Sequence, residues 1–391
     1  MKETTRLINL DSSHNQVSGK PLSTINPPLY HASTVLFERC EDLYLANTGS
    51  YKGATYGTDR LPLQTAFEEA ITGLEGGELT RAFQSGLSAI THTFLAYADS
   101  GDHILICDNV YGPGAHFCRK VLPRFNIEVD FVPSAVGADI ADYIKPNTRM
   151  IFLESPGSNT FEIQDIPAIT AIAREQGIIT VIDNTWATPL YLRPLALGVD
   201  ISIHSVTKYI SGHSDLLMGT VTANQQYAGI LADYYRCLEI YASADDCYRA
   251  LRGIKTLGVR LRQHEIAALE IARRLEVDDL VEAVIHPALP SHPQHERWKR
   301  DFAGSTGLFA FIFKSDYSDE TIAAFVNDLE LFGIGYSWGG FKSLITVGRY
   351  KRGGPSLYAG KNMIRLSIGL EDVGDLMHDL EQAFARLGVG I

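Results

Sequence analysis

Short apolar runs rich in β-branched residues alternate with stretches of helical periodicity through the middle of the chain. The runs lie at residues 103–107, 149–153, 178–182, 200–205 and 218–222. Each has the length and composition of a buried strand, and the segments between them carry apolar residues at helical spacing. This alternation predicts a mostly parallel sheet with helices on both faces.

The two ends of the chain have different patterns. Up to about residue 50, prolines interrupt any periodicity, which is typical of an extended arm. From about residue 246 a long helical stretch leads to strand-like runs and two further helices, which predict a smaller α+β unit. Because 391 residues exceed what one hydrophobic core usually serves, we predict three parts: an arm at 1–55 that reaches a neighbouring subunit, an α/β domain at 56–245 and an α+β domain at 246–391.

Three successive predicted strands are followed by polar residues. Glu154 follows the first, Asp183 the second and Lys208 the third. The carboxyl ends of parallel strands meet at one edge of a sheet, and ligands of open α/β sheets bind there. The sequence therefore predicts a binding crevice that contains these three side chains.

Lys208 lies close to Ser205, Thr207 and glycine, an environment suited to presenting an amine to a phosphorylated aldehyde. A Schiff-base lysine needs a lowered pKa, and the two hydroxyls are donors for a phosphate. A solvated loop lysine is the alternative. Asp183 favours the first interpretation, because a buried carboxylate keeps the ring nitrogen of pyridoxal phosphate protonated. The alternative role for Asp183 is a helix cap.

Other segments add phosphate, ring and carboxylate contacts. Residues 84–89 place small side chains before an apolar helical run, so that backbone N–H groups can surround a phosphate, although a plain glycine turn gives the same pattern. Tyr111 follows the strand at 103–107, where it can stack on a flat cofactor or simply occupy a turn. Arg365 lies in an apolar run, where a guanidinium would bind a carboxylate through two hydrogen bonds; a partly exposed strand arginine is the alternative.

Composition mainly excludes other classes of protein. The net charge is −12 and the basic residues are scattered, which argues against a nucleic-acid partner. The five cysteines fit no metal-ligand spacing and are expected to be reduced thiols in a cytoplasmic protein. No apolar run reaches membrane length, and residues 1–6 are not a signal peptide. We expect a cytoplasmic enzyme with a small-molecule substrate and with no metal, nucleic-acid or membrane partner.

Several motifs resemble the Cys/Met-metabolism family of pyridoxal-phosphate enzymes, and within it the bacterial cystathionine β-lyase group. They extend over nearly the whole chain: Leu74-Glu-Gly-Gly77, Phe152-Leu-Glu-Ser-Pro-Gly157, Ile182-Asp-Asn-Thr-Trp-Ala187, Thr207-Lys-Tyr209, Gly212-His-Ser-Asp215, Thr256-Leu-Gly-Val-Arg-Leu-Arg-Gln-His264, Tyr336-Ser-Trp-Gly-Gly340, Ile364-Arg-Leu366 and Ile368-Gly-Leu-Glu-Asp372. The resemblance implies pyridoxal 5′-phosphate as cofactor and the fold type I architecture of aspartate aminotransferase.

The same resemblance assigns roles to individual residues. It implies Lys208 as the Schiff-base lysine, Asp183 at the pyridinium nitrogen, Tyr111 stacked on the ring, and Tyr56 reaching the cofactor of the neighbouring subunit's site. Lys208, Tyr111 and Tyr56 are the expected catalytic residues. Around the phosphate it implies Gly86, Leu87, Ser205 and Thr207. For the substrate's α-carboxylate it implies Arg365, with Ser337 and Ser158 nearby. Trp338 matches the β-lyase form of its loop.

The expected reaction is β-elimination of L-cystathionine or a related cysteine S-conjugate to a thiol, pyruvate and ammonia. Lys208 is expected to remove the α-proton. The alternatives are γ-elimination or γ-replacement on a homoserine, homocysteine or canavanine-like amino acid, and a non-catalytic regulatory or structural homologue. The expected assembly is a homotetramer of two dimers with active sites shared across each dimer.

One position departs from the family's pattern. Family members usually carry arginine two residues after the arm tyrosine, where it reaches the neighbouring subunit's phosphate, whereas this chain has Thr58 after Tyr56. Either the phosphate is held with less charge, or Arg60 or Lys52 supplies the charge. The pocket beside the arm can also differ, which leaves the substrate less defined than the chemistry.

Overall fold

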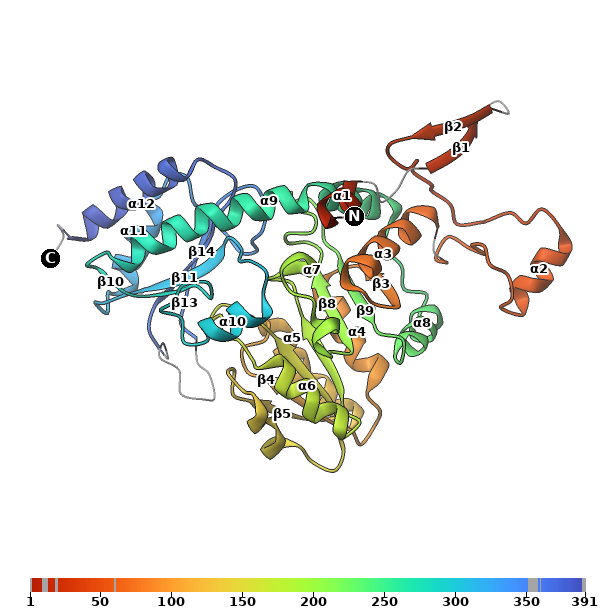
Figure 1. Ribbon diagram of the computed structural model, residues 1–391, viewed down its shortest axis with the longest axis horizontal. Helices are drawn as coiled ribbons and strands as arrows, with labels where there is room; N and C mark the ends of the chain where they lie inside the picture. Colours follow the sequence, from red (N-terminus) through yellow and green to blue (C-terminus); the bar gives the residue numbers. More distant parts are fainter. Residues whose placement is uncertain are drawn as a thin grey trace.

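The computed structural model describes residues 2–8, 13–17, 20–59, 61–350, 358 and 360–388. Two sheets of different size lie apart in it, and the long helix α9 (Ala244–Glu276) runs from one to the other (Figure 1). Ser243 caps the start of α9, since its side chain accepts a hydrogen bond from the backbone N–H of Asp246. The prediction of a helix over about 246–274 is confirmed.

Within the described residues the larger sheet has seven strands in the order β3-β9-β8-β7-β6-β4-β5. Its strands are β3 (Leu79–Phe83), β4 (His103–Cys107), β5 (Glu128–Val132), β6 (Thr148–Glu154), β7 (Ile179–Asp183), β8 (Ile201–Ser205) and β9 (Gly219–Ala223). Strands β4 to β8 pair in parallel, and β9 pairs antiparallel with both β8 and β3. The predicted mostly parallel sheet is confirmed.

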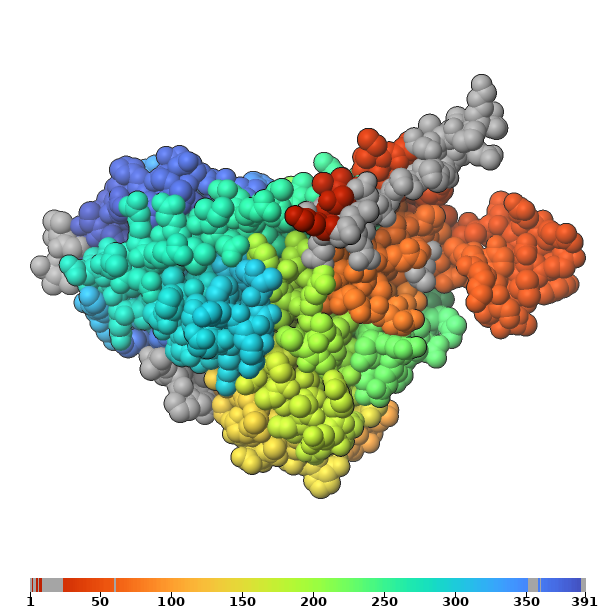
Figure 2. Space-filling view, in the orientation of Figure 1, coloured from red at the N-terminus to blue at the C-terminus, as the bar shows by residue number. Residues whose placement is uncertain are grey.

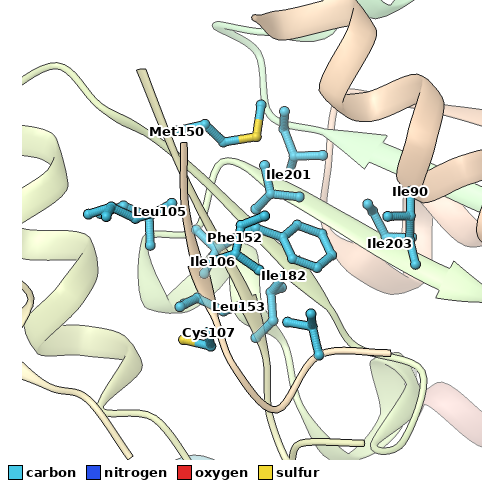
Figure 3. Packing of buried hydrophobic residues seen from close by; sticks show 14 of the residues in the cluster. Ile90, Leu105, Ile106, Cys107, Met150, Phe152, Leu153, Ile182, Ile201 and Ile203 are labelled. Carbon is cyan, nitrogen blue, oxygen red and sulfur yellow. The ribbon is translucent and has the colours of Figure 1, made fainter. Parts of the chain in front are cut away.

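Helices flank this sheet because its central strands are apolar on both faces. They are α3 (Pro62–Glu75), α4 (Gly86–Tyr97), α5 (Gly112–Lys120), α6 (Ile166–Glu175), α7 (Thr188–Tyr191) and α8 (Ala228–Cys237), with 3₁₀ turns at Leu122–Phe125, Ala138–Tyr143 and Pro194–Leu197. Figure 3 shows Ile90 of α4 beside Ile203 of β8, and Phe152 among neighbouring strand residues. All five residues of β7 are buried up to Asp183, so the polar residue that ends this strand is held by a rigid element.

The smaller sheet has the order β10-β11-β14-β13-β12. Its strands are β10 (Val281–Ile285), β11 (Leu308–Phe313), β12 (Gly333–Ile334), β13 (Leu344–Gly348) and β14 (Met363–Ser367), and its helices are α10 (His295–Asp301), α11 (Asp319–Asn327) and α12 (Val373–Gly388). A second buried cluster, with Phe311 and Phe325 among its members, joins this sheet to α9, α11 and α12. These elements correspond to the predicted α+β unit, and the exact boundaries of the three parts stay predictions.

The N-terminal segment contains more structure than its prolines indicated. It includes α1 (Glu3–Ile8), the hairpin of β1 (Ser13–Val17) and β2 (Lys20–Thr24), and α2 (Cys40–Asn47). Helix α2 buries none of its residues, and in Figure 2 the orange lobe that contains it stands away from the rest of the chain. Apolar side chains on this part of the arm are exposed, with Ile25 and Leu36 more than four-fifths accessible. A helix without a packing partner in its own chain is marginal, because tertiary packing supplies most helical stability.

Candidate active site

The site forms where β7 and β8 end. Asp183 is the last residue of β7 and pairs in register with Ile203 of β8, so the carboxylate and the chain leading to Lys208 lie on adjacent strands. Strand β6, on the other side of β7, ends at Glu154. The structure thus brings the three predicted strand ends to one edge of the sheet.

Lys208 is a mostly buried amine with a hydroxyl partner. Its Nζ donates a 2.7 Å hydrogen bond to Ser337 Oγ and lies 5.4 Å from the centre of the Trp338 ring. Burial, reinforced by the Arg365 guanidinium and opposed by Asp183, lowers the pKa of Lys208 to about 8. At mildly alkaline pH much of this amine is therefore neutral, the form in which an amine attacks an aldehyde or accepts a proton.

The loop that carries Lys208 is fixed by an arginine of α9. Arg260 Nη1 donates to the carbonyl of Tyr209 at 2.7 Å, and Nη2 donates to that of Ile210 at 3.3 Å. Gly212 lets the guanidinium approach, because a Cβ added there would lie within van der Waals overlap of Arg260 and because its φ is +70°. This contact explains why the motif at 256–264 accompanies the lysine motif.

Thr185, two residues after Asp183, orients the Asp183 carboxylate. Thr185 donates to Asp183 Oδ1 through its hydroxyl at 2.5 Å and its backbone N–H at 3.0 Å, and its oxygen also accepts from Ser205 N at 2.8 Å. Desolvation by burial raises the pKa of Asp183, against these hydrogen bonds and the nearby His204 and Lys208. One carboxylate oxygen is thus held while Oδ2 remains for a further donor. Thr185 was not singled out from the sequence, although its place two residues after the aspartate is the spacing of a local side-chain to backbone turn.

The start of α4 offers donors to an anion. Ser85 caps the helix by accepting from Ser88 N, which leaves the N–H groups of Gly86 and Leu87 without a hydrogen-bond partner among the residues described. A Cβ on Gly86 would lie 2.6 Å from Ser205 Cβ, so only glycine permits Ser205 to stand beside these amides. Two amides, a helix N-terminus and the Ser205 hydroxyl converge as the phosphate prediction requires.

Thr207 has a different local role from its neighbour. Its hydroxyl donates to the carbonyl of Met218 at 3.2 Å and accepts from Met218 N at 3.0 Å. The side chain thus ties the loop after β8 to the start of β9. To donate to a phosphate it would have to release the Met218 carbonyl, so its phosphate contact stays a prediction.

Tyr111 stands at the start of α5 with about two-fifths of its surface exposed. Its backbone N–H donates to Glu154 Oε2 at 2.6 Å, which connects the ends of β4 and β6. Desolvation, with smaller contributions from Glu154 and Asp183, raises the pKa of the phenol. The hydroxyl therefore remains protonated, and the accessible ring is free to face a planar group.

A polar corner surrounds Arg365 on β14, the residue that is predicted to bind the substrate's carboxylate. Nη1 donates to Asn159 Oδ1 at 3.0 Å and Nη2 to the carbonyl of Ser337 at 3.2 Å. The family resemblance implied Ser158 here, and the backbone N–H of Ser158 donates to the carbonyl of Asn109. The side chain that accepts from Arg365 is that of Asn159, which was not predicted. Ser337 links the corner to the lysine, since its Oγ accepts from Lys208 while its carbonyl accepts from Arg365.

Trp338 lies beside the Lys208 amine, next to Ser337 in the sequence. Its ring lies 5.3 Å from that of Tyr209 at an angle of 57°. The same ring packs against two separate clusters of buried apolar residues. Gly339, with φ +81°, is needed because a Cβ there would lie 2.9 Å from the backbone nitrogen of Tyr209. The Trp-Gly pair therefore brings the small-domain loop directly onto the lysine loop.

The arm residues are separate from this cluster within the chain. Tyr56 is about half exposed and bridges to Thr34 of the arm, and no described hydrogen bond or ring contact joins it to Lys208, Asp183 or Arg365. Thr58 is partly buried and Lys52 is exposed. Arg60, the other suggested source of positive charge, lies outside the described residues.

The residues present fit pyridoxal phosphate. Lys208 supplies an amine with a lowered pKa, and Tyr111 an exposed ring. Among the described residues, one oxygen of the Asp183 carboxylate and the first N–H groups of α4 have no hydrogen-bond partner, so they remain for the ring nitrogen and the phosphate. Across the described ranges no cluster of histidine, cysteine and carboxylate side chains could hold a metal ion. No helix in those ranges is long and apolar enough to cross a membrane.

Comparison with known proteins agrees with this fit. The family model for the Cys/Met metabolism PLP-dependent enzymes matches residues 4–385. A putative cystathionine β-lyase of Rhizobium johnstonii is 48% identical over 92% of this chain and 91% of its own length. Cystathionine β-lyase MetC of Escherichia coli is 38% identical over 99% of both chains.

Two further relatives show how the scaffold varies. An L-alanine/L-glutamate racemase of Wolbachia pipientis is 38% identical over 99% of this chain and 98% of its own. The crystal structure of MetB from Corynebacterium glutamicum superposes with a TM-score of 0.89 at 30% identity, covering 99% of this chain and 98% of that one. The predicted fold type I architecture is confirmed.

Proposed function

From the premise that this chain belongs to the Cys/Met metabolism family of PLP-dependent enzymes, we propose that it is a carbon–sulfur lyase that cleaves L-cystathionine, or a related cysteine S-conjugate, by β-elimination. The products are a thiol, pyruvate and ammonia. The observation that carries the proposal is Lys208, a mostly buried amine with a pKa of about 8. It shares Ser337 with Arg365, which has no carboxylate partner among the described residues. Relatives named cystathionine β-lyase support the substrate.

Binding begins with the substrate's carboxylate. Arg365 would receive it through a bidentate contact, and burial strengthens this contact because little water competes for the guanidinium. Ser337 then sets the distance between the two ends of the reaction centre, since the same residue contacts Arg365 through its carbonyl and Lys208 through its hydroxyl. The substrate's α-carbon is thereby held near Nζ.

Proton transfer falls to Lys208. Pyridoxal phosphate, when bound, supplies the covalent link to the substrate's amine and the electron sink that stabilises the negative charge left at Cα. Lys208 Nζ, of which a large fraction is neutral at pH 8, would remove the α-proton, and the Asp183 carboxylate would hold a proton on the ring nitrogen. Loss of the β-thiolate would follow, with the protonated Nζ or the Tyr111 hydroxyl returning a proton to the departing sulfur. The aminoacrylate that is left then takes up water and gives pyruvate and ammonia.

Active sites are proposed to be shared between subunits of a homotetramer built from two dimers. The exposed apolar arm and the isolation of Tyr56 from the site of its own chain support a second copy as its partner. The proposed location is the cytoplasm, which the five cysteines support because none forms a disulfide.

The keto acid formed from L-cystathionine tests the proposal. We expect pyruvate with homocysteine, whereas 2-oxobutyrate would establish γ-elimination. Alanine should be assayed alongside by chiral chromatography, because return of the α-proton to the opposite face gives racemisation, the activity named for one relative. Racemisation of alanine with a kcat/KM above that for elimination of any S-conjugate would overturn the lyase proposal. Lys208→Ala provides the blank for each reaction.

A further inference from the structure

Asn159 lies beside the proposed carboxylate site in an unusual backbone conformation. Its φ is +68°, in the left-handed region that asparagine tolerates better than most residues other than glycine. Its Oδ1 accepts the 3.0 Å hydrogen bond from Arg365 Nη1. The orientation of the amide follows from chemistry, because every guanidinium nitrogen bears donors and only the amide oxygen can accept.

The surrounding loop holds Asn159 in this conformation. Gly157 N donates to the Glu162 carbonyl at 2.9 Å, and Phe161 N donates to the Gly157 carbonyl at 3.1 Å. The Phe161 side chain is fully buried although its φ is also positive. Both ends of the loop are therefore anchored, and strain of this kind persists only where the surroundings determine it.

In the described part of the chain, the Arg365 guanidinium is held by neutral groups alone. Its two described partners are the amide oxygen of Asn159 and the carbonyl of Ser337, and its buried Nε has no hydrogen-bond partner. Because neither partner is anionic, the positive charge of Arg365 is oriented without being neutralised. The Asn159 Nδ2 group has no partner among the described residues either, so a neutral donor lies next to the charged one.

We propose that Asn159 is a positioning residue for an unmodified α-carboxylate: its oxygen fixes the Arg365 fork and its nitrogen adds a neutral donor. The inference rests on the proposed function, since the role of Arg365 in carboxylate binding is part of it. It explains why an amide is suited to this position. An aspartate would neutralise the guanidinium, and an apolar side chain would leave Nη1 unsatisfied.

The test compares L-alanine with L-alaninamide, which lacks the carboxylate, as ligands of the holoenzyme, with binding followed by the cofactor's absorbance. Asn159→Gly removes the side chain and keeps the left-handed backbone, and Asn159→Asp keeps the shape and adds a charge. Asn126→Gly is the matched control, because Asn126 has a φ of +59° at the end of a 3₁₀ turn remote from the site. Arg365→Ala is measured in the same way.

For Asn159→Gly we expect alanine affinity to fall about tenfold, with alaninamide affinity changed less than about threefold. Asn159→Asp should weaken the binding of alanine about a hundredfold, so that alaninamide binds more tightly than alanine. Asn126→Gly should match the parent. Arg365→Ala can lose the preference for alanine over alaninamide while both Asn159 variants retain it. In that case the inference about Asn159 is wrong and the proposed carboxylate site at Arg365 stands. If Arg365→Ala retains the preference, the proposed carboxylate site itself is wrong.

Discussion

Burial shifts the ionisation of two residues, Lys208 and Asp183, toward their neutral forms. It lowers the pKa of the amine to about 8 and raises the pKa of the carboxyl. The opposite charge of each group acts against the pKa shift of the other. A cofactor with a protonated ring nitrogen and an anionic phosphate changes both environments at once. The folded protein without cofactor therefore retains unfavourable desolvation at this site, which binding relieves.

Asp183→Asn separates function from stability. Turnover should fall at least about a hundredfold, because an amide cannot hold the proton on the ring nitrogen. In the cofactor-free protein the same change should raise Tm at pH 8. The raised pKa of Asp183 means that its contribution to stability is present at low pH and is lost as pH rises through the folded-state value, whereas asparagine never ionises. Thermal scans at pH 4 and pH 8 check this, and an equal Tm difference at both would contradict it.

Recombination of cofactor with the cofactor-free protein reports the amine directly. Attack on the aldehyde needs neutral Lys208, so the rate should rise with pH and level off above about 8. Arg365→Gln removes a neighbouring positive charge and should move the midpoint upward. A rate in the parent that still rises at pH 10 would indicate an ordinary, solvated lysine.

At the scale of elements, the lysine loop depends on α9 and α3. Arg260 of α9 holds the loop's carbonyls, and its own pKa is lowered by burial to about 10. At the end of α3, Glu75 accepts from Ser202 at 3.0 Å and pairs with His204, so the motif at 74–77 fastens this helix to β8. Two motifs distant in sequence thus support the same strand end.

Arg260→Met should destabilise the fold and disturb catalysis together. Loss of the guanidinium leaves the buried carbonyls of Tyr209 and Ile210 without donors, at a cost of about 1–3 kcal/mol. Denaturant unfolding and kcat with saturating cofactor should both show the change. Arg262→Met, at an exposed position two residues along α9, is the matched control and should behave like the parent. Equal effects of the two substitutions would contradict this role.

The strands that shape the site were predictable because they are apolar on both faces and end abruptly at polar residues, as β7 does at Asp183. Helix α2 was not, since none of its residues is buried in the described part of the chain and its pattern resembles a loop. Lys208, Asp183 and Arg365 stood out because charge is unusual beside apolar strands. Asn159 did not, because its contact is to a residue 206 positions away and no local pattern encodes it.

At the scale of the whole molecule, the arm is the part whose structure is least well explained by contacts within a single chain. Its exposed apolar residues, and the lack of a described contact between Tyr56 and the lysine cluster, predict that each site takes residues from two copies. Coexpression of Lys208→Ala with Tyr56→Phe tests this, each being inactive alone. A mixed dimer contains one site with both parental residues and one site with neither. Since about half of the dimers are mixed when the two variants associate at random, about a quarter of parental activity should return. No recovery despite demonstrated mixed dimers would place Tyr56 in the site of its own chain.

The most direct test of the account is the position of the cofactor's covalent attachment. The holoenzyme is reduced with borohydride and digested, and the peptide that carries the pyridoxyl group is sequenced by mass spectrometry. We predict a single adduct on Lys208, the mostly buried amine with a pKa of about 8, and none in Lys208→Ala. An adduct on another lysine, or the same adduct yield in the alanine variant, would contradict it.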